Sequence, residues 1–369
     1  MDQNQQNACL SDYFVNDIIE DSISQLRFFP NPQTTILASG GWDCKVRLWT
    51  VNYQVQKTGF NNQVSNAQFN SSLSYLEQLD NPILSIAWQG QTPNIFAGCT
   101  DGSIIQVDPQ KKAKNLLGKH NAGCSDMVYN QNLNILITGG WDGKLNIWDL
   151  RSNNPAVSFQ CPQKIYTMSN VGPLLVVGMG DRQMAYFNLS KLQMNQFQPE
   201  AYFEAHLKYQ TRRVTVFTEG DGYAIGSIEG RVAIKYINLN QPPNISKDTK
   251  TTTSPNDFAF RCHRVKTTSG MDEVYPVNDI AFNPVHGTFA TAGGDGAYII
   301  WDKDSKSRLR QGAMQNKCPL TAIDYSKNGE ILAYAAGYDW AKGISGDNQF
   351  QPKLGFHYLT DNDKLKKKK

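Results

Sequence analysis

The sequence predicts an all-β fold, a seven-bladed β-propeller built as one domain over residues 12–360. Two observations predict it: one short segment recurs six times along the chain, and the closest copies are about 40 residues apart. A period of about 40–45 residues with four strands per unit is typical of a propeller blade. A single blade cannot bury its faces alone, so blades must stack on their neighbours and close into a ring.

The recurring segment is clearest in GGWDCKVRLW from Gly40 and GGWDGKLNIW from Gly139. Each copy has an acidic residue in the fourth place and an apolar or aromatic residue in the tenth, or in the eleventh for the looser copy at Gly226. Asp-Gly and related pairs supply the positive φ angle that a two-residue hairpin turn requires. Each copy therefore predicts two strands joined by a tight turn, and the Trp-Asp pairs are those of a WD-repeat propeller. The other copies begin at Gly98, Gly178, Gly226 and Ala292, and the copy at Gly226 carries Glu229 in the acidic place.

The tenth positions set the spacing of the blades, with intervals of 58, 41, 39, 49 and 65 residues. The long intervals contain two polar, turn-rich insertions, residues 53–74 and residues 238–257 together with 265–273, and we expect all of these to be loops. The tenth positions, counting the eleventh place in the copy at Gly226, are Trp49, Val107, Trp148, Phe187, Tyr236 and Trp301.

The last blade must be completed from both ends of the chain. Two apolar runs follow in CPLTAIDYSKNGEILAYAAG, and LGFHYL at 354–359 supplies a third strand. The fourth strand is missing at the C-terminus, while DYFVND at 12–17 is strand-like and unassigned. We therefore expect the N-terminal strand to close the seventh blade. Residues 1–11 and the basic tail 361–369 are expected to be flexible.

The composition is that of a soluble globular protein, with 40% hydrophobic and 19% charged residues. A net charge of +3 is too small to indicate nucleic-acid binding over the whole surface. Seven cysteines without a CxxC pair favour neither a zinc site nor a disulfide framework and fit a reducing compartment. The N-terminus does not resemble a secretory signal, and no apolar run is long enough to cross a membrane.

Two sets of His, Thr, Asp and Trp could suggest a hydrolytic triad. A catalytic triad occurs once and lies in a cleft, whereas these sets recur at the blade period. Buried polar groups must be hydrogen-bonded, so we interpret each set as a structural network that braces its blade. The two sets are His120, Thr138, Asp142 and Trp148, and His263, Thr291, Asp295 and Trp301.

No phosphate-binding loop, zinc-protease motif or serine-hydrolase motif occurs in the sequence. His206, His286 and His357 are isolated, and lone histidines are more often surface or satisfied core residues than ligands. We expect no enzymatic activity, no catalytic residue, no cofactor, no metal and no small-molecule substrate.

Several stretches are not explained by blade-building. They are GSIEGRVAIKYIN (226–238), FAFRCHR (258–264), VYPVNDIAFNPVHGTFATAGGDG (274–296), WDKD (301–304) and YDWAKG (338–343). Together they resemble the messenger-RNA export WD-repeat proteins of the nuclear pore, the Rae/Gle family, over nearly the whole propeller. The Bub-type spindle-checkpoint WD-repeat proteins are close cousins that share EGRVAI and FAFRCHR, but NPVHGTFAT, WDKD and YDWAKG favour the export family. The length of the polar segment 53–74 departs from the family pattern.

The resemblance implies a non-enzymatic adaptor that captures a glutamate-rich hairpin of a Gly-Leu-Phe-Gly-type nucleoporin across the top of the propeller, with single-stranded RNA as a second partner on a cationic rim. The alternative is a kinetochore scaffold that binds the equivalent hairpin of checkpoint kinases. The candidate partner-binding residues are Arg231, Arg308 and Arg264. Arginine holds a carboxylate by two parallel hydrogen bonds, and we expect adjacent blades to place Arg231 and Arg308 on one rim. The alternative for Arg231 is a salt bridge to Glu229 within its blade.

The resemblance also implies a protein of the nucleus, at the nuclear envelope and pore complex, with a cytoplasmic pool. We expect a monomer that works within a heteromeric complex and does not insert into membranes. The tail KLKKKK at 364–369 fits either a nuclear-import or nucleic-acid element or a merely solvated terminus.

Overall fold

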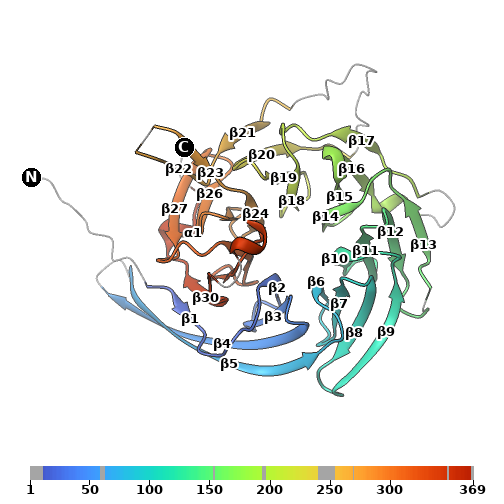
Figure 1. Ribbon diagram of the computed structural model, residues 1–369, viewed down its shortest axis with the longest axis horizontal. Helices are drawn as coiled ribbons and strands as arrows, with labels where there is room; N and C mark the ends of the chain where they lie inside the picture. The colour runs from blue at the N-terminus through green and yellow to red at the C-terminus, as the bar shows by residue number, and fades with distance from the viewer. Residues whose placement is uncertain are drawn as a thin grey trace, which may run out of the picture.

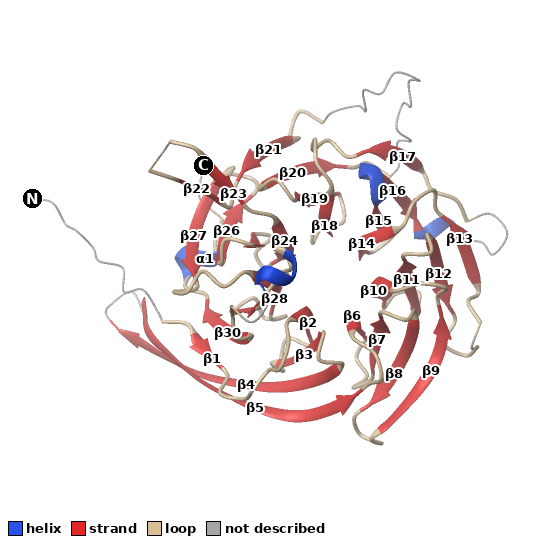
Figure 2. Cartoon of the chain, viewed as in Figure 1, coloured by secondary structure: helices blue, strands red, loops and turns tan. Residues whose placement is uncertain are grey.

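The computed structural model describes residues 11–58, 63–152, 154–192, 197–239, 254–268, 270–346 and 349–366. Seven four-stranded antiparallel sheets are arranged as blades in a ring (Figure 1). Strands make up nearly all of the regular structure, with only short helical turns between them (Figure 2). The prediction of a seven-bladed propeller is confirmed.

In six blades the strands follow chain order from the innermost to the outermost. The first blade contains β2 (Ile23–Phe28), β3 (Ile36–Gly41), β4 (Lys45–Thr58) and β5 (Gln63–Gln78). The second contains β6 (Ile83–Trp88), β7 (Ile95–Cys99), β8 (Ser103–Asp108) and β9 (Ala113–Lys119). The third contains β10 (Cys124–Asn130), β11 (Ile135–Gly140), β12 (Lys144–Trp148) and β13 (Val157–Gln160).

The fourth blade contains β14 (Ile165–Val171), β15 (Leu174–Met179), β16 (Gln183–Asn188) and β17 (Ala201–Glu204). The fifth contains β18 (Thr211–Val216), β19 (Gly222–Ser227), β20 (Arg231–Tyr236) and β21 (Phe258–Arg261), and the sixth β24 (Val277–Phe282), β25 (Phe289–Gly293), β26 (Ala297–Asp302) and β27 (Ser307–Ala313). The helical turns are η1 (Gly180–Arg182), η2 (Leu189–Lys191), η3 (Gly343–Gly346) and α1 (Asp361–Lys364).

The seventh blade joins the two ends of the chain. Its strands are β28 (Leu320–Tyr325), β29 (Ile331–Ala336), β30 (Lys353–Tyr358) and, outermost, β1 (Tyr13–Phe14). Tyr13 pairs with Phe356 in antiparallel register. The N-terminal strand therefore closes the ring, as the sequence predicted.

Blades are stacked through apolar side chains and linked by polar ones on the innermost strands. Four carboxylate or carboxamide side chains of these strands accept a hydrogen bond from the backbone N–H of the next blade, at 2.6–3.0 Å. Between the fourth and fifth blades the hydroxyls of Thr167 and Ser169 accept in the same way, at 3.2 and 3.0 Å. Because these acceptors are buried or half-buried and satisfied, they fix the position of one blade against the next without leaving an unpaired donor. No sequence motif indicates these links; the four carboxylate and carboxamide links join Gln25 to Ile86, Asp126 to Met168, Asp279 to Ile323 and Asp324 to Phe28.

The prediction that residues 53–74 form a loop is wrong for residues 53–58 and 63–74, while residues 59–62 lie outside the described part of the chain. β4 and β5 continue far beyond the blade as a long hairpin, in which Tyr53 pairs with Phe69. Burial alternates along most of this ribbon, and the half-buried side chains of Tyr53, Phe69 and Leu73 pack against the core between the first and seventh blades. The polar residues that suggested a loop occupy the exposed alternate positions, so period-two burial and not overall polarity decided the structure.

Residues 265–273 also differ from the loop that was expected, since β22 (Arg264–Lys266) and β23 (Asp272–Val274) form a short hairpin. At the C-terminus, Asp361–Lys364 is the helix α1, which has a capping box with Thr360 and a buried Asp363. The basic tail expected from residue 361 is thus helical at its start. Residues 1–10, 240–253 and 367–369 lie outside the described residues, so the flexible termini and most of the 238–257 loop stay predictions.

Candidate functional site

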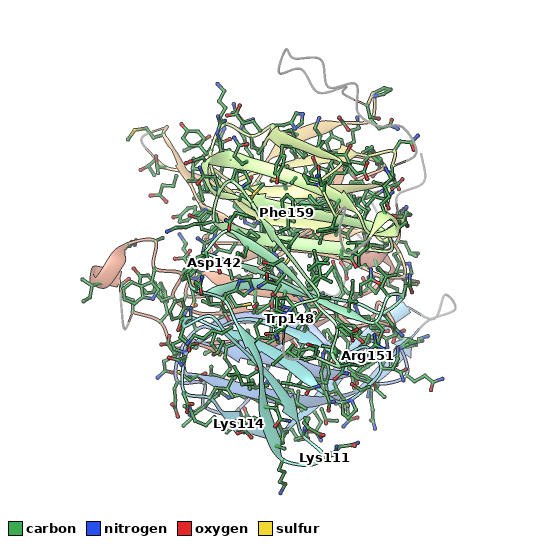
Figure 3. All side chains as sticks on the ribbon, turned by 90° about the vertical axis from the view of Figure 1, so that its right-hand side faces the viewer. Lys111, Lys114, Asp142, Trp148, Arg151 and Phe159 are labelled. Carbon is green, nitrogen blue, oxygen red and sulfur yellow. The ribbon has the colours of Figure 1, made fainter. Side chains whose placement is uncertain are left out.

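Each blade has two ends, and the strand order assigns every loop to one of them. The turns between second and third strands, such as residues 141–143, lie at the same end as the connections between blades; we call this end the turn face. The loops between third and fourth strands, such as residues 149–156, lie at the other end, the opposite face. Figure 3 views the ring from the side and shows Asp142 and Arg151 of the third blade toward its two opposite faces.

In the third blade, the four residues expected to form a network are joined by hydrogen bonds. Nε1 of Trp148 donates to Oγ1 of Thr138 at 2.8 Å. Nε2 of His120 lies 2.8 Å from that oxygen, and its Nδ1 lies 3.1 Å from Asp142. Since a carboxylate only accepts, Nδ1 carries the proton and Nε2 accepts from the threonine hydroxyl. Burial lowers the pKa of His120 despite the nearby carboxylate, which keeps the ring neutral.

The sixth blade repeats this arrangement. Nδ1 of His263 lies 2.8 Å from Asp295, its Nε2 lies 2.9 Å from Oγ1 of Thr291, and Trp301 donates to the same hydroxyl at 3.1 Å. The side chains of His120 and His263 are fully buried. Both ring nitrogens of each histidine have a hydrogen-bond partner, as expected of buried polar groups in a network that braces a turn.

In the first blade the turn carboxylate is bound by an arginine in place of a histidine. Trp49 donates to Oγ of Ser39 at 3.0 Å, but the turn carboxylate of Asp43 is bound by the buried Arg47 at 2.6 Å. The guanidinium takes the place of the imidazole. The sequence reading missed this substitution because Arg47 comes from the third strand of the blade and not from the connection that supplies histidine elsewhere.

Arg231 and Arg264 meet at the turn face of the fifth blade. Nε of Arg231 lies 3.4 Å from Oε1 of Glu229, so the salt bridge considered as an alternative from sequence is present. Nη2 of Arg264 donates to the backbone oxygen of Glu229 at 2.9 Å, and its Nη1 lies 3.9 Å from Asp272. The side chain of Arg231 is 32% exposed, so a partner on the turn face can still reach it.

The expectation that Arg231 and Arg308 share one rim is wrong. Arg231 opens β20 directly after the turn 228–230, which places it on the turn face. Arg308 pairs with Trp301 at the end of β26, beside the loop 303–306, which places it on the opposite face. Both residues follow a turn in sequence, but the two turns lie at opposite ends of their blades. Arg308 donates to Oε1 of Gln311 at 2.9 Å.

The turn face also carries exposed apolar side chains that the sequence reading did not identify. Ile228 lies in the same turn as Glu229, and Tyr209 lies in the connection that precedes β18. Exposed apolar side chains on one face are candidate anchors for a protein partner. The relevant side chains and their exposed fractions are Trp42 (40%), Tyr209 (54%), Ile228 (44%), Trp340 (52%) and Ile344 (83%).

A second feature lies on the outer side, between the fifth and sixth blades. A cavity of about 180 Å³ is formed by β21 and the loop 303–306. Its walls combine aromatic rings with cations, and Nζ of Lys306 lies 4.8 Å from the centroid of the Phe258 ring. The aromatic and cationic residues that line this cavity are Phe258, Phe260, Trp301, Arg261, Lys303 and Lys306.

Within the described ranges, no group of three or more His, Cys, Asp or Glu side chains is arranged to hold a metal ion. In the same part of the chain, no helix is both long enough and apolar enough to span a bilayer.

The fold and the recurring Trp-Thr-His-Asp network define a WD-repeat β-propeller. In agreement, residues 15–50, 111–149 and 263–302 match the family described as WD domain, G-beta repeat. These segments cover the three inner strands of the third and sixth blades, and the two inner strands with the start of β4 in the first.

Similarity to known proteins extends over nearly the whole chain. The chain is 34% identical to Protein Rae1 of Drosophila melanogaster, with 90% of each chain covered. It is 35% identical to the Poly(A)+ RNA export protein of Schizosaccharomyces pombe, with 94% of this chain and 90% of the relative covered. It is also 32% identical to the Mitotic checkpoint protein bub3 of Dictyostelium discoideum, with 88% of each covered. The chain therefore belongs to the Rae1/Gle2 family of WD-repeat proteins.

Proposed function

We propose that this protein is a non-enzymatic adaptor for messenger-RNA export that docks at the nuclear pore. It binds a glutamate-rich hairpin of a Gly-Leu-Phe-Gly-type nucleoporin on its turn face. The role in messenger-RNA export is supported by the similarity to relatives that are named as RNA export proteins. The observation that carries the site is the grouping of Arg231 and Arg264 on the face that also exposes Ile228 and Tyr209.

The chemistry of this face fits an acidic hairpin with apolar anchors. Aromatic and arginine side chains dominate the binding energy of protein interfaces, and both kinds are exposed here. A glutamate of the partner gains most from Arg231, because guanidinium and carboxylate form two parallel hydrogen bonds. Such a partner would compete with Glu229, which now lies 3.4 Å from Arg231.

Titration calorimetry with a synthetic glutamate-rich nucleoporin hairpin tests this docking. Arg231→Glu replaces attraction by repulsion, so we expect the dissociation constant to rise at least about 10-fold. Arg308→Glu is the matched control, because it makes the same charge change on the opposite face. Undiminished binding by Arg231→Glu, or equal losses in the two variants, would count against docking on the turn face.

The aromatic and cationic cavity beside β21 supports a second role, the binding of single-stranded RNA. Bases stack on aromatic rings while cations track the phosphates, and this cavity offers Phe258, Lys306 and Arg261, with Arg308 nearby on β27. Binding to an RNA oligonucleotide should fall steeply with added salt, as phosphate neutralisation requires. Lys306→Glu should weaken RNA binding while leaving hairpin binding intact; binding that is absent or insensitive to salt would remove this role.

The alternative function is a kinetochore scaffold that binds the equivalent hairpin of checkpoint kinases. The similarity to a bub3 protein is the observation that favours it. Imaging of the tagged protein separates the two functions. A nuclear rim in interphase with a weaker cytoplasmic signal supports export, whereas foci at kinetochores in mitosis alone support the checkpoint.

A further inference from the structure

The outermost strand of the first blade differs from the other outermost strands. β5 is 16 residues long, whereas β9 and β27 have 7 residues, β13, β17 and β21 have 4, and β1 has 2. The two 7-residue strands carry cations: Lys114 and Lys119 in β9, Arg308 and Arg310 in β27. In β5 the only charged residue is Glu77, and there is no proline.

β5 presents an open sheet edge. Among the described residues it pairs only with β4, so its other side is a row of backbone N–H and C=O groups without a strand partner. At the far end of this edge the backbone oxygen of Gln78 accepts from Nζ of Lys114. Figure 1 shows it as the outermost arc of the ring. Natural sheets protect such edges by short strands, lysines, prolines or β-bulges. The other outermost strands are short or carry cations, whereas β5 is long and has neither lysine nor proline. Its two bulges, at Ser65 and Ser74, flank the stretch 66–73 and leave that stretch regular.

The hairpin of β4 and β5 carries paired amides on its exposed face. In the antiparallel register, Gln54 lies opposite Gln68, Asn52 opposite Asn70, and Gln56 opposite Asn66. All six side chains are exposed. The other face of the hairpin is held on the seam between the first and seventh blades by Phe69 and its neighbours. The open edge is therefore a fixed template and not a loose ribbon.

We propose that β5 is a dimerisation edge that pairs antiparallel with β5 of a second copy of this chain, with Gln68 on the two-fold axis. In this register Gln68 faces Gln68 of the partner subunit, and Asn66 faces Asn70 of the partner subunit. Each amide row then continues through four strands, for example from Gln54 and Gln68 into the partner. Asn and Gln ladders of this kind stabilise stacked strands because each amide both donates and accepts.

A second copy fits this edge for two reasons. A two-fold axis makes an antiparallel edge complementary to itself. The strand is also uncharged from Val64 to Leu76, so no like charges meet near the axis. The two Glu77 residues lie at opposite ends, each about 30 Å from the axis at the usual rise per residue. The dimer leaves the turn face open, so it is independent of the function proposed above and departs from the monomer expected from sequence.

Sedimentation of the full chain, alone and without partners, tests the proposal. We expect a mass of twice 41.3 kDa to accumulate between 1 and roughly 100 μM protein. Gln68→Lys places two like charges directly opposite one another, about 5 Å apart. We expect this variant to raise the dimer dissociation constant at least about 10-fold.

Gln54→Lys is the matched control, since it adds the same charge to the same exposed face in a strand without a free edge. In the proposed dimer the two introduced ammonium groups are three strand spacings apart, about 14 Å, beyond the Debye length at physiological salt. The control should therefore keep the dimer. A wild-type chain that stays monomeric at roughly 100 μM, a dimer that survives Gln68→Lys, or equal losses in both variants would overturn the proposal.

Discussion

The imidazole of His357 lies 2.6 Å from a carboxylate oxygen of Asp12, which joins the last strand of the chain to the residue before the N-terminal strand. The side chain of His357 is fully buried. Tyr334 donates to the other carboxylate oxygen of Asp12 at 2.6 Å. On the far side of the imidazole, Asp363 of α1 lies 3.8 Å from Nε2 of His357 and 3.3 Å from Arg310. Both ends of the chain are thus held by one buried cluster.

This cluster predicts that stability depends on pH. Burial opposes a charge on His357, but the bond with Asp12 outweighs it and raises the pKa of the ring. A raised pKa adds stability that is complete below the unfolded value of about 6.5 and is lost as the pH rises through the folded value. His357→Asn should therefore reduce the free energy of unfolding more at pH 5.5 than at pH 8.5, as measured by urea unfolding. An equal loss at every pH would contradict this origin.

Asp363 contributes a pH dependence of stability with the opposite sign. Burial favours the neutral form of Asp363, but hydrogen bonds from His357 and Thr360 and the charge of Arg310 lower its pKa to about 2. This adds stability above the unfolded value, worth about 2 kcal/mol, which is lost as the pH falls towards 2. Asp363→Asn should lower the midpoint of urea unfolding at pH 6. The difference from wild type should shrink below about pH 4, and a constant difference would contradict the assignment.

The networks predict a stability cost for a change that preserves shape. Thr138→Val removes the hydroxyl that accepts from Trp148 and contacts Nε2 of His120, so two buried polar groups lose a partner. We expect a loss of about 1–3 kcal/mol and a similar loss for Thr291→Val in the sixth blade. Urea unfolding measures both. A catalytic role for the network would instead leave stability unchanged, which would overturn its interpretation as a brace.

The centre of the ring contains an ion network whose removal should be costly. Arg213 of β18 lies 3.0 Å from Asp126 of β10 and 2.8 Å from Asp279 of β24. Burial raises the pKa of Asp279 even though the charge of Arg213 lowers it. Arg213 therefore offsets part of the free-energy cost of burying this carboxylate. Arg213→Met should cost about 3–5 kcal/mol, because it leaves uncompensated buried charge.

Arg151→Met is the control for that substitution. Its side chain is 88% exposed and pairs with Asp149 at the surface, so the same change should shift the free energy of unfolding by no more than about 0.5 kcal/mol. Comparable losses in the two arginine variants would show that the central network does not stabilise the ring.

The long hairpin should stabilise the closed ring. The Phe69 ring lies 5.9 Å from Tyr13 and 6.2 Å from Phe356, centroid to centroid, and so covers the seam. Phe69→Ala should destabilise the fold by about 2–3 kcal/mol through lost contact and the cavity it leaves. Leu76→Ala, on the same strand but 44% exposed, should have a small effect. Equal effects would indicate that the hairpin does not clamp the seam.

The blade repeat can be predicted from the sequence because six of the seven blades are formed by strands that are adjacent along the chain, with short turns between their second and third strands. Gly143 and Gly296 have φ angles of 75° and 77°, as the hairpin turns require, and the periodic anchors such as Trp148 are fully buried. The hairpin at 53–74 was misread because its inward residues, Tyr53 and Phe69, are outnumbered by polar neighbours on the exposed face.

Sequence by itself determined the class of fold, the closure of the ring by an N-terminal strand, and the membership of His120 and His263 in repeated networks. These features depend on short-range turns and on the periodicity of residue types, both of which can be recognised in the local sequence. Only the tertiary structure decided that Arg231 and Arg308 face opposite ways, that Asp12 reaches His357, and that β5 is left as an open edge. Each of these depends on which end of a blade a residue occupies or on what packs against it, and contacts between distant segments fix both.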